Sequence, residues 1–178
     1  MVNFIVATDV LEKNNMSEKL CDVGAERAVL ASLVQYGLDA YVNVSDLINH
    51  ETFGNTNNQI LFQCISKVLS NEQQVDITAL LSAASQLNFS ETVNTPQELK
   101  YIKSLFDFPV NKDNVVSFAV QIKKFEFARK IKKLTAQIHK NVDKVTGKES
   151  IDEIVQILEN PVTDFLREDD GGKRPEKI

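Results

Sequence analysis

The chain has no tryptophan, and its 178 residues include only six glycines, four prolines and two cysteines. Few glycines and prolines mean few sharp turns, which favours long helices. The cysteines, Cys21 and Cys64, form neither a metal-ligand pattern nor a disulfide framework. Cys64 lies in an apolar helical run and is expected to be buried and reduced. His50 and His139 lie far apart without ligand spacing, so the sequence predicts no metal site.

Long apolar runs and nucleotide-binding motifs are also missing. No apolar stretch approaches the ~18 residues that a membrane span requires, and residues 1–8 lack the basic flank of a secretory signal. There is no G-x-x-x-x-G-K-[ST] loop to hold phosphates; the sequence Gly171-Gly172-Lys173 has the wrong spacing. Asp169 and Asp170 lie in a polar tail without an apolar pocket to shift their pKa values. We therefore expect a cytoplasmic protein with no catalytic residue and no cofactor in this chain.

The composition is that of an ordinary globular protein, with 43% hydrophobic and 25% charged residues. A chain of this length can bury a sizeable core. The net charge of −5 argues against a dedicated nucleic-acid binder. We expect a flexible N-terminal arm over residues 1–21, a helical domain over 22–145, and a linker with a short helix and an acidic, flexible tail over 146–178.

Helical periodicity dominates the chain, and no segment shows convincing β alternation, so the predicted fold class is all-α. Asp22 and Asp76 are expected to cap helices, and Thr95-Pro96-Gln97-Glu98 is a strong start signal. Gly37 lies where a helix C-terminal cap belongs. The predicted helices cover residues 23–36, 40–48, 55–70, 77–87, the segment from 96 to just before Pro109, and 114–142.

The helix predicted over residues 114–142 carries apolar side chains at steps of three or four residues. These are Val115, Phe118, Ile122, Phe125, Ala128, Ile131, Leu134, Ile138 and Val142. Such spacing predicts one apolar seam along nearly the whole helix, which would be about 40 Å long. Little chain remains to cover its second half, which favours an oligomer interface or a helical hairpin. The candidate oligomer-interface residues are Phe118, Ile122, Phe125, Ile131, Leu134 and Ile138.

The same helix is strongly basic. Lys123, Lys124, Arg129, Lys130, Lys132, Lys133 and Lys140 are opposed only by Glu126. One interpretation is a solvated face opposite the seam, and the other is a surface for an acidic partner or for DNA phosphates. Stacking on nucleic-acid bases is poorly supported, because only Phe127 lies off the seam. The candidate partner or DNA surface comprises Lys123, Lys124, Arg129, Lys130, Lys132 and Lys133.

A short amphipathic helix is predicted after the break at residues 145–148. Ser150 and Glu153 can form a capping box at its start, and Asn160-Pro161 is expected to end it. An isolated helix this short is marginal in water, so it needs a surface to dock on. Its candidate docking residues are Ile151, Ile154, Val155 and Leu158.

Several separated segments together resemble one family. They are Ala25-Glu26-Arg27-Ala28-Val29-Leu30, then Phe53 with Ile60-Leu61-Phe62, then Val75-Asp76-Ile77-Thr78, then Tyr101-Ile102-Lys103-Ser104-Leu105, and finally Asn114 through Phe118-Ala119 to Arg129-Lys130-Ile131. In this order and spacing they resemble the N-terminal domain of DnaB-type replicative DNA helicases. One position departs from the family pattern, because Asn58 stands where the family has a histidine.

The resemblance implies a compact all-α domain with a long C-terminal helical hairpin and a short linker helix. It also implies that such domains pair through their hairpins and build a collar above hexameric ATPase domains, where primase or a helicase loader docks. The segment at 151–158 would be the linker helix that clips onto a neighbouring motor domain. ATP and magnesium are expected only for that motor domain, which is absent from this chain. DNA binding is expected to be weak or to depend on the parent protein, an ATP-dependent helicase.

Two other interpretations remain open at this point. One is a free-standing adaptor, such as a helicase loader or the helicase-binding domain of a primase, which would be monomeric alone. The other is a nonspecific DNA-binding protein that uses the basic helix, whose binding would collapse with added salt. An enzyme complete within these residues fits the sequence least well.

Overall fold

The structure is a computed structural model, and it describes residues 20–170. Nearly all of the predicted arm at 1–21, and the glycine-containing end at 171–178, lie outside this range. The regular elements within it are all helical: α2 (Val23–Tyr36), α3 (Leu38–Val44), the 3₁₀ turn η1 (His50–Thr52), α4 (Thr56–Ser70), α5 (Ile77–Gln86), α6 (Ser90–Val93), α7 (Pro96–Phe106), the 3₁₀ turn η2 (Lys112–Asn114), α8 (Val115–Val142) and α9 (Ile151–Asp170). The all-α prediction is confirmed.

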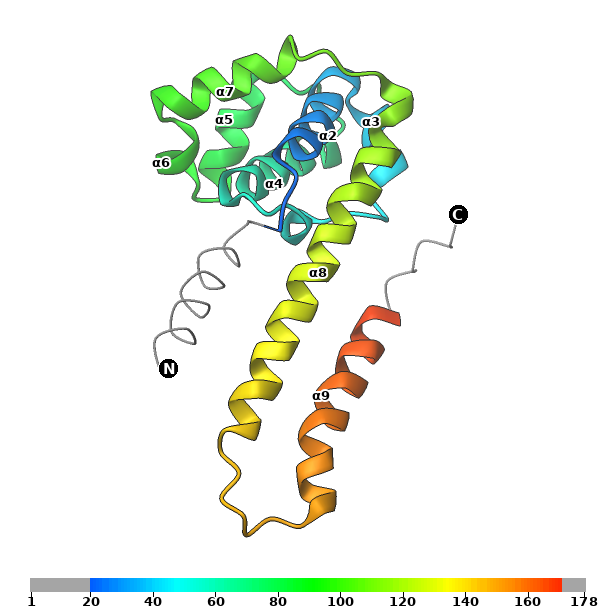
Figure 1. The fold of residues 1–178 in the computed structure, drawn as a ribbon. Helices are drawn as coiled ribbons and strands as arrows, with labels where there is room; N and C mark the ends of the chain where they lie inside the picture. The colour runs from blue at the N-terminus through cyan, green and yellow to red at the C-terminus, as the bar shows by residue number, and fades with distance from the viewer. Residues whose placement is uncertain (1–19, 171–178) are drawn as a thin grey trace, which may run out of the picture.

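The molecule has two parts, a head and a hairpin (Figure 1). The head consists of α2–α7 and the first half of α8, and the hairpin consists of the second half of α8 with α9 running back beside it. At the centre of the head, α2 is buried over most of its surface, and it packs against α4, α7 and α8. The long C-terminal helical hairpin predicted for this fold is therefore present.

The core of the head is apolar and closely packed. The Phe53 and Phe62 rings lie 5.1 Å apart between their centroids. Leu30, Ile65 and Leu80 are completely buried around them. Cys64 is also fully buried, and this burial raises the pKa of its thiol to about 11, so the side chain remains a neutral thiol at physiological pH.

The predicted helix-start signals operate as expected. The Asp22 carboxylate accepts a 2.9 Å hydrogen bond from the Ala25 amide, and Asp76 accepts one of 2.7 Å from Ala79. Thr95 accepts from the amide of Glu98 with Pro96 at the first helical position. These bonds satisfy amides that have no partner within their own helix.

The second helix is shorter and starts earlier than predicted. It covers Leu38–Val44 rather than residues 40–48. Gly37 has a φ of +56°, which lets its amide close α2 on the Leu33 carbonyl while its own carbonyl accepts from Ala40 and Tyr41. The chain therefore turns at one residue and enters α3 directly.

The prediction that Asn160-Pro161 ends the last helix is wrong. The helix continues through Pro161 to Asp170, after the predicted capping box of Ser150 and Glu153. Proline removes one helical hydrogen bond, so the continuation needs compensation from packing. Beyond the proline, Phe165 packs against Phe127 of α8 with ring centroids 5.5 Å apart. The segment predicted as a separate linker helix is thus the first half of a hairpin arm.

We expect Pro161→Ala to stabilise α9. The substitution restores the missing amide donor to the Ile157 carbonyl and removes a penalty of about 3 kcal/mol that proline imposes inside a helix. Hydrogen exchange followed by mass spectrometry should show slower exchange over residues 154–164. Exchange in α4, within the head, should not change and serves as the control. Faster exchange in α9 would mean that the proline ring itself is needed for packing against α8.

Candidate functional site

The apolar stripe of α8 winds around the helix rather than following one face. Each residue advances about 100° around a helix, so a step of three falls about 60° short of a full turn. The stripe takes four such steps in succession between Ile122 and Leu134, which turn it by about 240°. Ile122 consequently faces the head, and Leu134 faces α9. The prediction of a single continuous seam is therefore wrong.

The winding divides the predicted interface residues between several environments. Ile122 is 1% exposed in the head core, and Phe118 packs on that core. Both are therefore removed from the candidate interface. Phe125, Leu134 and Ile138 are half-buried. Of the six predicted interface residues, Ile131 alone is exposed, with 43% of its surface accessible.

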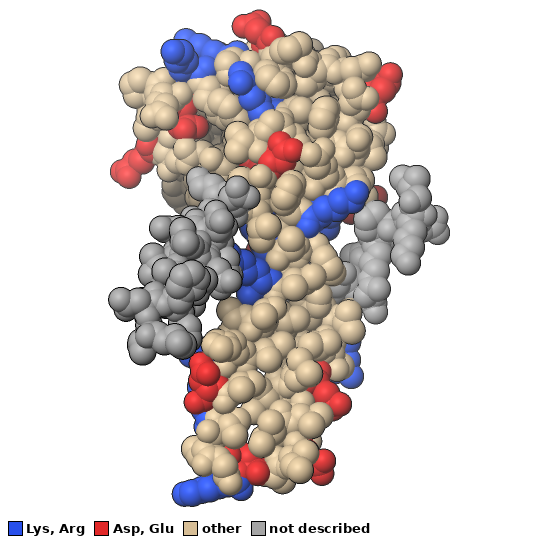
Figure 2. All heavy atoms as spheres, viewed as in Figure 1, with Lys and Arg blue, Asp and Glu red and all other residues tan. Residues whose placement is uncertain are grey.

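The second arm adds further exposed apolar side chains. Ile151 is 80% exposed and Leu158 is 54% exposed. We call the exposed apolar residues of both arms the hairpin patch: Phe127, Ile131 and Val142 of α8, and Ile151, Ile154, Val155, Leu158 and Leu166 of α9. In Figure 2 the face of the hairpin turned to the viewer is largely uncharged along its middle, with charged side chains at its margins. An apolar surface with a polar rim is typical of an interaction site.

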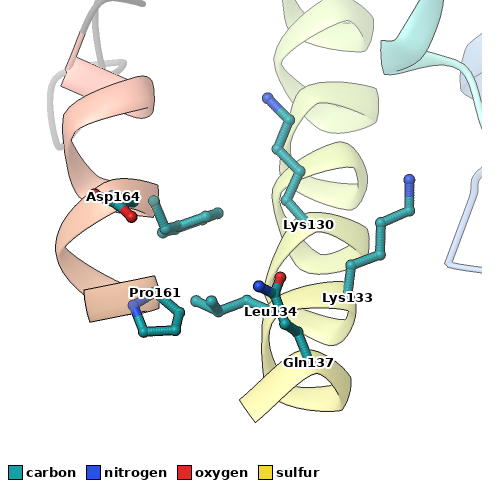
Figure 3. Close-up of a pocket in the computed structure, with 7 residues that line it drawn as sticks. Lys130, Lys133, Leu134, Gln137, Pro161 and Asp164 are labelled. Carbon is teal, nitrogen blue, oxygen red and sulfur yellow. The ribbon is translucent and has the colours of Figure 1, made fainter. Parts of the chain in front are cut away.

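A cleft of about 380 Å³ separates the two arms near the middle of the hairpin. It is lined by Lys130, Lys133, Leu134, Gln137, Pro161, Asp164 and Phe165. Leu134 extends from α8 toward Pro161 of α9, and the lysines lie along α8 on the side nearer the head (Figure 3). The arms pack against each other around this cleft, yet much of their apolar surface remains outside their mutual contact.

Among the candidate partner-surface residues, Lys123, Lys130 and Arg129 bind within the chain. The Lys123 and Lys130 ammonium groups each lie 2.8 Å from a carboxylate oxygen of Glu126. The Arg129 guanidinium donates to three backbone carbonyls, of Leu20, Glu51 and Thr52, at 2.7, 2.9 and 2.7 Å. Arg129 therefore attaches α8 to the head, whereas Lys123 and Lys130 neutralise Glu126 within α8 itself. The remaining candidates, Lys124, Lys132 and Lys133, are exposed.

Glu126 is the last buried residue of α8, with 2% of its surface exposed. Burial by itself would raise the pKa of its carboxyl group. Hydrogen bonds from Lys123, Lys130 and Thr52, together with the charge of Lys123, outweigh burial and hold the pKa below its ordinary value of 4.5. Glu126 is therefore a buried, ionised carboxylate that joins α8 to η1.

A second buried carboxylate, Glu26 of α2, holds the segment that follows η1. It accepts hydrogen bonds from the amides of Gly54 and Asn55, at 2.6 and 3.4 Å, and from the Asn58 side chain at 2.7 Å. Asn58 occupies the position of the family's histidine, and here it supplies an N–H donor to Glu26. A side chain at Gly54 would collide with Cys21, which explains the glycine.

The structural role of both carboxylates is absent from the sequence-based predictions. In these, Glu26 is only a motif residue and Glu126 only an exception in a basic run. A signal was available, because Glu26 is the one acidic residue of α2, a helix that is mainly apolar apart from the neighbouring Arg27. A charge at such a position requires buried partners.

Two kinds of site were looked for specifically in the part of the chain that the structure describes, a metal site and a membrane span. Among residues 20–170, no group of three or more His, Cys, Asp or Glu side chains is placed to hold a metal ion. Over the same range, no helix combines the length and apolar character needed to cross a membrane.

Comparisons with known proteins identify the class. The family described as DnaB-like helicase N-terminal domain matches residues 18–124, which is more than half of the chain. The crystal structure of the N-terminal domain of DnaB helicase from Mycobacterium tuberculosis has the same fold, with a TM-score of 0.67 at 14% sequence identity. That match covers 83% of this chain and 99% of the mycobacterial one. A comparison with curated protein sequences found no match.

The fold and the match together define a non-catalytic domain of a helicase. The chain belongs to the family of DnaB-like helicase N-terminal domains.

Glu126 is expected to make folding stability depend on pH in acid. Because its pKa is lowered in the folded state, its contribution is fully present above the ordinary value of 4.5 and is lost as the pH falls through the lowered value. Glu126→Gln should therefore reduce stability by about 1–3 kcal/mol at pH 7, and by less at acidic pH, where the wild-type carboxylate is also protonated. Urea unfolding at both pH values measures the difference.

The control for this comparison is Glu91→Gln, the same change at an exposed residue of α6. It should leave stability nearly unchanged at both pH values. An equal loss for Glu126→Gln at neutral and acidic pH would contradict an ionised role for Glu126.

Proposed function

We propose that this chain is the assembly and partner-docking domain of a hexameric replicative helicase, and that it self-associates through the hairpin patch. The observation that carries the proposal is the row of exposed apolar side chains on both arms of the hairpin. Membership of the DnaB-like family supports a helicase context and weakens the adaptor interpretation.

The energetics of the hairpin support self-association. Burying a large aliphatic side chain contributes about 1.5–3 kcal/mol. Ile131 on one arm and Leu158 on the other expose about half of their surface, and Ile151 at the far end exposes most of it. Two helices cannot enclose a core, whereas two hairpins together form a four-helix bundle that buries the apolar sides of all four helices. A second copy of the chain supplies the matching surface.

The choice of residues follows from the winding of α8. Ile131, Leu158 and Ile151 are exposed, whereas Ile122 is part of the head core. Leu134 faces α9 within the same chain and contributes to the hairpin itself (Figure 3). The proposed interface is therefore the hairpin patch, with half-buried Ile138 and Phe125 beside it.

Docking of other replication proteins forms the second part of the proposal. A primase or a helicase loader would bind the collar, with exposed Lys124 and Lys133 offering positive charge to an acidic partner. The parent protein would carry an ATPase domain that uses ATP and magnesium, and it would act in the cytoplasm. The predicted contact of Ile151, Ile154, Val155 and Leu158 with that motor domain remains a prediction. It would use side chains of the same patch as self-association.

The test combines Ile131→Asp with Leu158→Asp, one exposed residue on each arm. Sedimentation velocity of the wild-type chain should show a dimer or a larger assembly. The double variant should sediment as a monomer, because each buried aspartate would cost several kcal/mol without a partner. Circular dichroism should show an unchanged helical signal, since both side chains lie outside the head.

The matched control is Val42→Asp, which places the same charge at an exposed aliphatic residue of α3 in the head. It should keep the wild-type mass. A wild-type chain that is monomeric at high concentration would contradict the proposal and favour an adaptor. An assembly that survives the double variant would show that the hairpin patch is not the interface.

A further inference from the structure

The hairpin projects from the head over a long distance. Val115, Ala119, Ile122 and Glu126 are the buried residues of α8, and none of residues 127–142 is buried. About 16 residues of α8 therefore extend beyond the last buried position, a length of about 24 Å at 1.5 Å per residue. Small changes of angle where α8 leaves the head become large displacements at the tip (Figure 1).

Polar contacts hold α8 to the head at the exit point. Ile122 is the last buried apolar residue of α8, one turn before Glu126. The Thr52 hydroxyl donates to the Glu126 carboxylate at 2.8 Å, and the Thr52 carbonyl accepts from Arg129 at 2.7 Å. Neighbouring turns of the helix thus bind one residue of η1. Arg129 also reaches Leu20 on the N-terminal side of the head.

Hydrogen bonds suit this position because they constrain direction. Apolar packing is non-directional and permits a helix to roll, whereas a hydrogen bond weakens steeply as its angle departs from linearity. The planar guanidinium of Arg129 binds three carbonyls from a fixed fork. Together with Glu126 it resists both rolling and tilting of α8.

The partner segment is itself immobilised. Asn49 and Thr52 form a capping box around η1. Gly54, two residues after η1, donates its amide to the Glu26 carboxylate of α2. An added Cβ at Gly54 would lie 3.2 Å from both the Arg129 guanidinium and the Glu26 carboxylate, so the two groups approach the same bare stretch of backbone. The contacts run continuously from the centre of the head to the base of the hairpin.

We propose that Glu126 and Arg129 are positioning residues that fix the direction of the hairpin relative to the head. We call Glu126 and Arg129, with their contacts to η1, the clamp. A tilt of about 15° at the clamp would move the tip of α8 by about 6 Å, more than the rise of one helical turn. Symmetric pairing of two hairpins requires both copies to present the patch at the same angle. The effect on pairing of two hairpins rests on the function proposed above. The fixed angle between the hairpin and the head does not depend on that function.

The test measures the angle directly in the full chain. Spin labels are attached at Glu91→Cys in the head and Lys144→Cys after α8, both exposed, in a background with Cys21→Ser and Cys64→Ala. Double electron–electron resonance, with an excess of unlabelled protein to isolate distances within one chain, gives the distance distribution. It should be narrow for the wild-type clamp. In Glu126→Gln/Arg129→Lys it should broaden or shift by about 5 Å or more, the displacement that a tilt of this size produces.

Lys124→Gln is the control, because it removes a positive charge from the same stretch of α8 outside the clamp, and it should retain the narrow distribution. If the double variant does not fold, Arg129→Lys alone is measured. This substitution keeps the positive charge but removes the planar guanidinium that binds the three carbonyls. A distribution as narrow as the wild type, with the same mean, in the folded variant would overturn the proposal. A monomeric wild-type chain would contradict the proposed function only, because the distances are measured within one chain.

Discussion

The short segment around η1 depends on two buried carboxylates, and the arrangement of the whole molecule depends on that segment. A carboxyl group removed from water is strongly unfavourable unless charged or hydrogen-bonding partners surround it. Glu26 meets this requirement with donors from Gly54, Asn55 and Asn58, and Glu126 meets it with Thr52 and two lysines. Each carboxylate binds the same stretch of chain from a different helix. The segment therefore connects α2 to α8, and the head to the hairpin.

The long helix serves two surfaces because its apolar stripe winds. A stripe with steps of three and four in regular alternation stays on one face, whereas repeated steps of three turn it around the helix. In α8 the stripe fills the head core at Ile122 and faces the second arm at Leu134. Between these positions, Glu126 and Arg129 attach the helix to the head on the side that the apolar stripe has left. One continuous helix can therefore end a domain and begin an exposed arm without a break.

Sequence reasoning predicted the elements of the head well and its polar contacts poorly. Caps at Asp22, Asp76 and Thr95 act between residues three apart, so local pattern was sufficient to find them. The partners of Glu26, and Thr52 as the head partner of Glu126, are 28 to 74 residues away along the chain, and no local signal identifies them. The error at Pro161 has the same origin. The intrinsic cost of proline is a local property, but the compensating contact between Phe165 and Phe127 is not.

By itself the sequence determined the helical class, most helix boundaries and the family. Short-range periodicity indicates the class, capping residues indicate the boundaries, and ordered motifs indicate the family. Only the tertiary structure decided which basic residues are exposed, since Lys123, Arg129 and Lys130 look like their neighbours in the sequence yet bind within the chain. It also decided that residues 151–170 form one arm of a hairpin. These outcomes depend on contacts between segments far apart in the chain. The free energy of such contacts exceeds the conformational preference of each segment, and no single segment specifies them.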